Sequence, residues 1–391
     1  MNWILWLGMA QLAAWLVLVF RWHGFWRMGD ADFHLPPAPA LPPGGKWPEV
    51  VAVIPARNEA DNITRALASV LGQDYPGRLK VIVVNDNSDD DTARLAGRLA
   101  EGDGRLTVLD APPKPDGWAG KVAAMDFGVA HALKNHEPGG SGPEYFWFTD
   151  ADIVHPPEML RKLVKKALTE KLGLTSVMVR LSTGSFWEKL LVPAFVYYFF
   201  LLYPPRAVSR PDAYAAGAAG GCMLLRREAL ADIGGMAAIR DAVIDDCSLA
   251  RKVKDRGWRL WLGLDARARS LRPYENLGDF WRMVERSAYE QLHHSPLLLV
   301  LSLAGMGFAF VLPALYALGF VFGQPWPHFP GLVAFGLMSA SYLPAVRHHG
   351  LAKRWALTLP ASAVLMSLMT LTSAINHMSG RGVQWRGRRG D

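Results

Sequence analysis

Long uncharged apolar runs at both ends of the chain restrict its architecture more than any other feature. Residues 3–20 (WILWLGMAQLAAWLVLVF) carry no charged side chain, and three further runs without Asp, Glu, Lys or Arg lie within residues 297–375. About 20 apolar residues are enough for a helix to cross the hydrocarbon core of a bilayer. The sequence therefore predicts a membrane protein, with one large polar domain between its membrane segments.

The first apolar run is followed by basic and aromatic residues. Residues 21–27 read RWHGFWR, and no small-residue cleavage site of a signal peptide is present there. Aromatic side chains collect at the ends of membrane helices, and basic ones favour the cytoplasmic side. We interpret residues 1–27 as a retained membrane anchor whose C-terminal end lies in the cytoplasm.

The C-terminal runs predict a membrane helical region over residues 293–378, followed by a basic tail over residues 379–391. The three runs are residues 297–320, 331–346 and 356–375. Buried core helices are the alternative, which the lack of any charge over such lengths disfavours. Three spans would place the basic tail outside the cytoplasm, against the usual charge bias. The middle run, which is the shortest, could therefore be re-entrant instead.

Charge and cysteine content restrict the partners and the compartment. The net charge is +7, and the basic residues crowd near the membrane segments. Attraction to anionic lipid head groups explains this placement better than nucleic-acid binding, so we expect a membrane partner and no nucleic acid. Two cysteines, Cys222 and Cys247, are too few for a disulfide framework or a metal-binding spacing. This fits a domain that faces the reducing cytoplasm.

After a Pro- and Gly-rich linker over residues 28–49, apolar strand-like runs alternate with segments of helical periodicity. Strands are predicted at residues 50–56, 79–86, 105–111 and 145–152, and helices at residues 58–73, 88–100 and 120–133. Strands that are apolar on both faces are typical of a mainly parallel sheet covered by helices on both sides. Residues 50–292 therefore predict one α/β domain. Within it, residues 186–205 form either an interfacial helix or a core helix.

Polar clusters directly follow three of the predicted strands. They are Arg57-Asn58-Glu59, Asn85-Asp86-Asn87 and Asp150-Ala151-Asp152. In a parallel sheet, ligands bind in the crevice beyond the carboxyl ends of the strands. We therefore expect these three loops to converge on one binding site.

The pair of Asp150 and Asp152 predicts a divalent-cation site. A buried carboxylate is costly unless it is paired or bound to a cation. Carboxylates two residues apart can both reach one Mg²⁺ or Mn²⁺, and Mg²⁺ commonly takes one or two carboxylates together with substrate phosphate oxygens. The alternative is a solvated turn in which an aspartate caps the following helix.

Four further positions are candidates for ligand binding, and each also has a purely structural interpretation. Asp86 is placed to hydrogen-bond a base or a ribose, although such residues also favour tight turns. Lys121 stands at the head of a predicted helix, where a lysine and helix-start amides bind phosphate; otherwise it is an ordinary exposed lysine. Gly220 and Gly221 either let the backbone approach a ligand closely or merely form a turn.

Asp245 and Asp246 open a predicted amphipathic helix. The helix dipole favours acids at this end, which is the plainer interpretation. The functional interpretation is a general base that removes a proton from an attacking hydroxyl group. The residue pattern alone leaves both open.

Six motifs, in the same order and spacing, resemble those of the family 2 inverting glycosyltransferases. They are VIPARNEADNI, VIVVNDNSDDDT, GWAGKVAAMDFG, FTDAD, GGCMLLRREAL and IDDCSLARKVKDRGWR. Together they lie within residues 50–292. The resemblance implies a GT-A type fold, in which a nucleotide-diphospho-sugar donor binds across the crevice of the sheet.

The resemblance also implies roles for individual residues. Asp86 would contact the nucleoside, and Asp150 and Asp152 would hold Mg²⁺ or Mn²⁺ and the diphosphate. Asp246, with Asp245 beside it, would deprotonate the acceptor hydroxyl. The implied donor site comprises Pro55, Arg57, Glu59, Asp86, Lys121, Asp150, Gly220 and Gly221.

The membrane layout, together with RMVERSAYEQLHHSP at residues 282–296, is similar to that of the bacterial glycosyltransferases associated with hopanoid biosynthesis. This finer resemblance implies a lipid acceptor derived from hopanoids. It also implies a multi-pass protein of the bacterial cytoplasmic membrane with its catalytic domain in the cytoplasm. Other lipid-biosynthesis enzymes would be further partners.

The chain departs from the family pattern in three places. Asn87 stands where many members have Gly, which alters the turn after Asp86, and Asp245 replaces the usual Glu. The Gln-x-x-Arg-Trp element of processive synthases is absent. A processive polysaccharide synthase is therefore disfavoured. An inactive nucleotide-sugar-binding scaffold is the remaining alternative, and the intact acidic residues argue against it.

Overall fold

The computed structural model describes residues 3–36, 46–135, 142–323 and 325–380, together with two short strands near the C-terminus. The chain forms two compact units. A sheet unit contains residues 31–182 and 207–272, and a helical unit contains the described parts of residues 1–30, 183–206 and 273–383. Residues 37–45 of the expected linker and most side chains of the basic tail lie outside the described residues.

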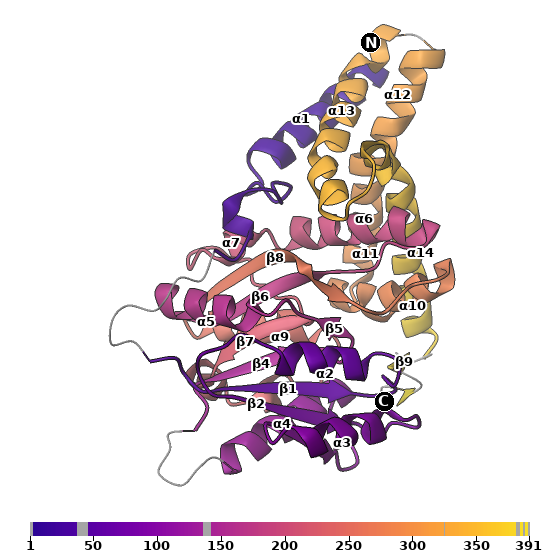
Figure 1. Cartoon of the computed structure of the whole chain (residues 1–391). Helices are drawn as coiled ribbons and strands as arrows, with labels where there is room; N and C mark the ends of the chain where they lie inside the picture. Colours follow the sequence, from indigo (N-terminus) through magenta and orange to yellow (C-terminus); the bar gives the residue numbers. More distant parts are fainter. Residues whose placement is uncertain are drawn as a thin grey trace. The chain divides into compact units, whose positions relative to one another are not determined.

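The sheet unit is built on one eight-stranded sheet with the order β3-β2-β1-β4-β7-β6-β8-β5 (Figure 1). Its strands are β1 (Val50–Ala56), β2 (Leu79–Asn85), β3 (Leu106–Asp110), β4 (Tyr145–Thr149), β5 (Ile153–Val154), β6 (Leu172–Arg180), β7 (Cys222–Arg226) and β8 (Arg259–Ser270). β1 pairs in parallel with β2 and β4, β2 with β3, and β6 with β8. β7 runs antiparallel to β4 and β6. The fold is therefore the expected GT-A-like, mainly parallel sheet.

These pairings place one set of chain segments at a common edge of the sheet. The carboxyl ends of β1, β2, β3, β4, β6 and β8 lie there, because these strands run in the same direction. The amino end of β7 lies at the same edge, because β7 runs the opposite way. The loops that carry Glu59, Asp86 and Asp150 therefore leave the sheet on one side, as the sequence predicted. The loop of Gly220, which the prediction did not include, lies at the same edge.

Helices cover both faces of this sheet. They are η1 (Ala31–Phe33), α2 (Ile63–Leu71), α3 (Thr92–Gly102), α4 (Gly120–Lys134), α5 (Met159–Glu170), α8 (Arg227–Asp232), η2 (Met236–Ile239) and α9 (Asp245–Asp255). On β1, Ala52 and Ile54 share a buried cluster with Leu67 of α2, whereas Val53 faces α4. A Cβ on Gly128 of α4 would lie 2.6 Å from Val53, so only glycine permits this approach. Both faces of β1 are thus buried, as its uninterrupted apolar run indicated.

The helical unit contains the apolar runs. Its elements are α1 (Trp3–Phe20), α6 (Phe186–Leu202), α10 (Leu277–Ala288), η3 (Glu290–Leu292), α11 (Pro296–Met306), a π-helical turn (Gly307–Val311), α12 (Leu312–Phe322), α13 (Pro325–His348), η5 (Lys353–Thr358) and α14 (Leu359–Met378) (Figure 1). α7 (Pro205–Val208) lies at the boundary between the units, and β9 (Gln384–Trp385) pairs with β10 (Arg388–Arg389).

Among the described residues, five helical segments are long and apolar enough to cross a membrane, by length and composition. They are Trp3–Phe20, Phe186–Val208, Pro296–Phe322, Pro325–His348 and Lys353–Met378. Large apolar side chains such as Phe322 and Trp326 are 84% exposed on this unit, as lipid-facing residues are. The middle C-terminal run, which the sequence left as a candidate re-entrant segment, is a continuous helix of 24 residues.

Polar side chains of α1 contact the π-helical turn. Gln11 Nε2 donates to the carbonyl of Phe308 at 2.8 Å, and Trp15 Nε1 donates to the carbonyl of Ala309 at 2.7 Å. A π-turn interrupts the regular hydrogen bonding of a helix, and unpaired carbonyl groups are costly in an apolar environment. α1 is therefore a packed member of the helical unit as well as an apolar segment.

Three details differ from the expectations. The start of the predicted linker is structured, because Phe33 and Leu35 are buried and His34 forms a β-bridge with Leu264. Residues 186–205 and 273–292 group with the helical unit instead of the α/β domain. α6 is largely buried there, which favours a core helix over an interfacial one. α2 begins at Ile63, five residues later than predicted from sequence, because Asn58 is left-handed with φ +51°.

Candidate active site

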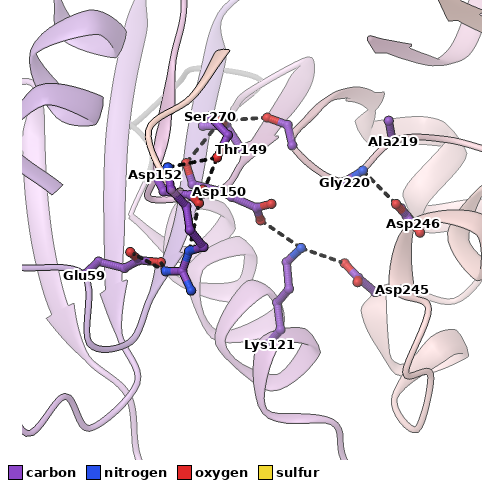
Figure 2. A network of polar contacts seen from close by, with 12 residues as sticks. Glu59, Lys121, Thr149, Asp150, Asp152, Ala219, Gly220, Asp245, Asp246 and Ser270 are labelled. Carbon is purple, nitrogen blue, oxygen red and sulfur yellow. Dashed lines mark hydrogen bonds and ion pairs between the residues drawn. The ribbon is translucent and has the colours of Figure 1, made fainter. Parts of the chain in front are cut away.

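Lys121 joins two of the predicted acidic motifs at the edge of the sheet. Its Nζ lies 2.8 Å from Oδ1 of Asp150 and 3.3 Å from Oδ2 of Asp245 (Figure 2). Lys121 stands in the first turn of α4, Asp150 directly follows β4, and Asp245 is the first residue of α9. Burial alone would lower the pKa of Lys121, but the two carboxylates outweigh it and raise this pKa. Lys121 is therefore a fixed positive charge between two carboxylates.

Asp246 is held by two backbone amides. The N–H of Gly220 donates to Oδ2 at 2.7 Å (Figure 2). The N–H of Cys247 donates to Oδ1 at 2.7 Å. Burial and the neighbouring Asp245 carboxylate raise the pKa of Asp246 to about 6, although Lys121 and the two N–H groups act to lower it. A carboxylate with a pKa in this range can accept a proton near neutral pH. The geometry suits the general base predicted from the sequence.

A side chain at position 220 would crowd these groups. A Cβ there would lie 3.2 Å from Oδ2 of Asp246 and 3.3 Å from Nζ of Lys121. Such contacts are tighter than an ordinary van der Waals approach. The backbone at Gly220 thus lies close to two charged side chains of the site, and close approach to a ligand stays a prediction.

A second group of charges lies around Arg272, which the sequence analysis missed. Its guanidinium donates to both carboxylate oxygens of Glu59 at 2.9 Å and lies 3.3 Å from Oδ2 of Asp152. Ser270 Oγ also donates to Asp152 at 3.3 Å (Figure 2). Arg272 follows the carboxyl end of β8, so the end of that strand was the signal that could have identified it. Asp152 and Glu59 thus share one arginine as an ion-pair partner.

The loop after β2 is shaped by Arg57. Its Nη1 donates to the carbonyl of Asp86 at 2.7 Å and to that of Asn87 at 2.9 Å. Asn87 has φ +50°, the left-handed conformation that glycine adopts easily and asparagine tolerates. Asn87 therefore adopts a backbone conformation that glycine would also allow. Pro55 is the sixth residue of β1, lies opposite Val84 of β2 and is part of the sheet interior.

Asp150 and Asp152 already have positively charged partners within the protein. This differs from the expectation that a bound cation must supply the partner. Asp150 is paired with Lys121, and Asp152 with Arg272. Within the described ranges, no group of three or more His, Cys, Asp or Glu side chains is arranged to hold a metal ion. The Asp150 side chain is still 37% exposed. Two carboxylates and a substrate phosphate are a donor set that Mg²⁺ accepts, so these residues fit a cation shared with a ligand.

Comparison with known proteins identifies the family. A model described as glycosyl transferase family group 2 matches residues 145–374, which is more than half of the chain, and one described as glycosyl transferase family 2 matches residues 51–234. The chain belongs to glycosyltransferase family 2. This family assignment agrees with the six motifs and with the observed sheet.

Two curated glycosyltransferases are similar in sequence to part of this family 2 chain. An N-acetylglucosaminyltransferase of Mesorhizobium japonicum is 27% identical over 205 residues, which are 51% of this chain and 45% of the relative. A 4,4'-diaponeurosporenoate glycosyltransferase of Staphylococcus aureus is 36% identical over 143 residues, which are 35% of this chain and 33% of the relative. The chain thus matches less than half the length of each of them.

A solved structure supports the fold of this family 2 chain over nearly its full length. A mannosyltransferase of Pyrobaculum calidifontis, determined with GDP-Man and Mn²⁺, has a TM-score of 0.55 and covers 97% of this chain and 99% of its own. The two sequences are 20% identical, so the likeness concerns the fold.

Proposed function

We propose that the protein transfers a sugar, with inversion, from a nucleotide-diphospho-sugar to a lipid acceptor in the membrane. The observation that carries this proposal is the network of Lys121, Asp150, Asp245, Asp246 and Gly220. In this network, Lys121 pairs with Asp245 and with the solvent-accessible Asp150 at the edge of the sheet. Asp246, whose pKa is raised, follows Asp245 and accepts a hydrogen bond from Gly220. This edge is where α/β sheets bind their ligands.

In the proposed reaction, Asp246 takes the proton of an acceptor hydroxyl group while the hydroxyl oxygen attacks the anomeric carbon of the donor. The new bond from carbon to the acceptor oxygen forms as the bond to the diphosphate oxygen breaks. The electron pair of that bond leaves with the nucleoside diphosphate. One displacement inverts the anomeric centre. Gly220 N–H fixes the base in position, and Lys121, at the start of α4, is placed to bind phosphate oxygens.

A divalent cation is part of the proposal. Asp150 and Asp152 would hold Mg²⁺ or Mn²⁺ together with the donor diphosphate, and the cation would stabilise the charge of the leaving group. The P. calidifontis mannosyltransferase was determined with Mn²⁺, which supports this choice. Arg272 keeps Asp152 and Glu59 in place, and Arg57 keeps the loop of Asp86 in the shape proposed to receive the nucleoside.

The acceptor is proposed to be a lipid on the cytoplasmic face of a bacterial membrane. Five apolar helical segments support a multi-pass protein, and a content of only two cysteines suits a reducing compartment. The S. aureus relative is named for a carotenoid acceptor, which supports a lipid. The sequence resemblance makes a hopanoid-derived lipid the finer proposal.

A transfer assay tests this function. The full chain in lipid nanodiscs is incubated with radiolabelled UDP- and GDP-sugars, Mn²⁺ and either a hydroxylated hopanoid or a carotenoid acid. Label is expected in the lipid fraction with one donor, and a chelator should abolish it. Label in the carotenoid alone would keep the lipid acceptor but remove the hopanoid. Absence of turnover with every donor would contradict the proposed activity.

The pH dependence of transfer should follow the ionisation of Asp246. The base works only when Asp246 is ionised, and the pKa of Asp246 is raised to about 6. Below about pH 6, kcat/KM is therefore expected to fall about tenfold per pH unit, as for a single titrating group. The Asp245 carboxylate raises this pKa, so Asp245→Asn should move the acid limb to lower pH. The measurement is kcat/KM from about pH 4.5 to about pH 8, a range that brackets the raised pKa of Asp246. An acid limb that stays in place in the variant would contradict the pairing.

A further inference from the structure

Two buried side chains close the turn that carries Asp150 and Asp152. Oγ1 of Thr149, which precedes the turn, lies 2.8 Å from Nε2 of His155, which follows it. Thr149 is 1% exposed and His155 3% exposed. The backbone N–H of His155 also donates to Ser69 Oγ at 3.1 Å. Buried hydrogen-bonding groups therefore hold the two ends of this turn together.

The direction of these hydrogen bonds is determined by a third group. Thr149 Oγ1 also lies 3.0 Å from the carbonyl oxygen of Gly221, which can only accept. The carbonyl oxygen of Asp150 lies farther from Oγ1, at 3.5 Å, so Thr149 donates its single proton to Gly221 and His155 donates to Thr149 through Nε2–H. Burial lowers the pKa of His155 to about 3, so the ring stays neutral with its proton on Nε2. One chain of hydrogen bonds runs from His155 through Thr149 to Gly221.

Gly221 belongs to the loop that holds the proposed base. The preceding residue, Gly220, donates its N–H to Asp246 at 2.7 Å. The backbone pairing of β4 with β7 ends at Thr149 and Cys222, so this ladder does not reach Gly221 or Gly220. The Thr149 hydroxyl therefore extends the connection between β4 and this loop by one residue, to the glycine beside the one that touches the base.

We propose that Thr149 and His155 are positioning residues that fix the Asp150–Asp152 turn relative to the glycine loop holding Asp246. The two sides of the site, one for the donor diphosphate and one for the acceptor proton, would then keep a constant spacing. This inference rests on the proposed transfer reaction for its catalytic consequence. Its structural part, the coupling between the turn and the loop, does not need that reaction.

The chain offers a matched set of variants for the test. Thr149→Val keeps the shape of the side chain and removes its hydrogen bonds with His155 and Gly221 together with the longer contact to the Asp150 carbonyl, and Thr149→Ser keeps the hydroxyl. Thr175 lies in β6 of the same sheet, is fully buried, and its hydroxyl has no hydrogen-bond partner among the described residues. Thr175→Val therefore makes the same chemical change without breaking a hydrogen bond.

The expected kinetic result is a selective loss in the Thr149→Val variant. A misplacement of about 1 Å costs up to about 100-fold in rate, so kcat should fall about 10- to 100-fold while the donor KM stays nearly constant. The acid limb of kcat/KM should move to higher pH, because a weakened Gly220 N–H bond disfavours the ionised Asp246. Thr149→Ser should restore both, and Thr175→Val should match the wild type.

Hydrogen–deuterium exchange tests the coupling without any substrate. In Thr149→Val, peptides that cover residues 150–155 and 219–222 should both exchange faster than in the wild type, and in Thr175→Val neither should change. If the wild type transfers no sugar, this exchange pattern still supports the coupling, so the two failures are distinguishable. His155→Leu, a second variant that keeps the Thr149–Gly221 bond, should accelerate mainly residues 150–155. Unchanged exchange in Thr149→Val, or equal changes in Thr175→Val, would overturn the inference.

Discussion

Replacing Asp246 with Asn is expected to reduce sugar transfer by about 100- to 10,000-fold, the range that general-base catalysis typically contributes. The amide has nearly the shape of the carboxylate but cannot take the acceptor proton. Donor binding should persist, because Lys121 and Asp150 are unchanged. One of the two backbone N–H groups, of Gly220 or Cys247, loses its acceptor, which costs about 1–3 kcal/mol of stability. The measurements are initial rates of lipid labelling and donor affinity by calorimetry.

Asp255 supplies the control for this variant. It lies at the other end of α9 and pairs only loosely with Arg251, at 3.5 Å, with its side chain 57% exposed. Asp255→Asn should therefore leave transfer within about twofold of the wild type, because exposed ion pairs contribute little. If Asp246→Asn retained full activity, the base would have to be another residue. If Asp255→Asn lost as much, the effect would be structural.

Replacing Asp150 with Asn should have the second-largest effect, a loss of at least about 100-fold in kcat/KM through weaker binding of cation and donor. Asp150 is one of the two proposed cation ligands and is also the closer carboxylate partner of Lys121. The neutral amide is a weaker ligand for Mg²⁺ or Mn²⁺ than a carboxylate. The variant should therefore need a higher Mn²⁺ concentration for half-maximal activity, which a metal titration at fixed donor measures.

A carboxylate at the opposite edge of the sheet serves as the comparison. Asp103 lies before β3 and binds Arg105 at 2.7 Å in a surface turn. Asp103→Asn should change neither kcat/KM nor the Mn²⁺ requirement. An unchanged Mn²⁺ requirement in Asp150→Asn, together with lost activity, would assign Asp150 to holding Lys121 and remove it as a cation ligand.

Local patterns allowed much of the fold to be predicted. β1 at residues 50–56 agrees with its predicted bounds, and α4 extends its prediction by one residue. The reason is that burial requires apolar residues along the element. They are continuous in a strand buried on both faces and recur with the helical period in a helix buried on one stripe. The convergence of Asp86, Asp150 and Glu59 at one edge followed from the direction of parallel strands. Their roles in donor binding stay predictions.

The pairings within the site could not be predicted in the same way. Arg272 binds Glu59 and Asp152, which are 213 and 120 residues away in sequence. Lys121 joins acids from two other elements, and Thr149 reaches Gly221, 72 residues later. A contact made by a single side chain produces no periodic pattern in the sequence. The residues near it in the chain therefore do not indicate which distant residue it contacts.

The sequence by itself determined the apolar segments, the alternation of strands and helices, and the sheet edge at which the polar loops meet. Only the tertiary structure decided which charges neutralise each other there, and that residues 186–205 pack within the helical unit. The physical reason is the range of the interactions. Solvent exposure acts on every residue along an element and repeats with its period, whereas a buried ion pair or hydrogen bond depends on where two distant segments come together.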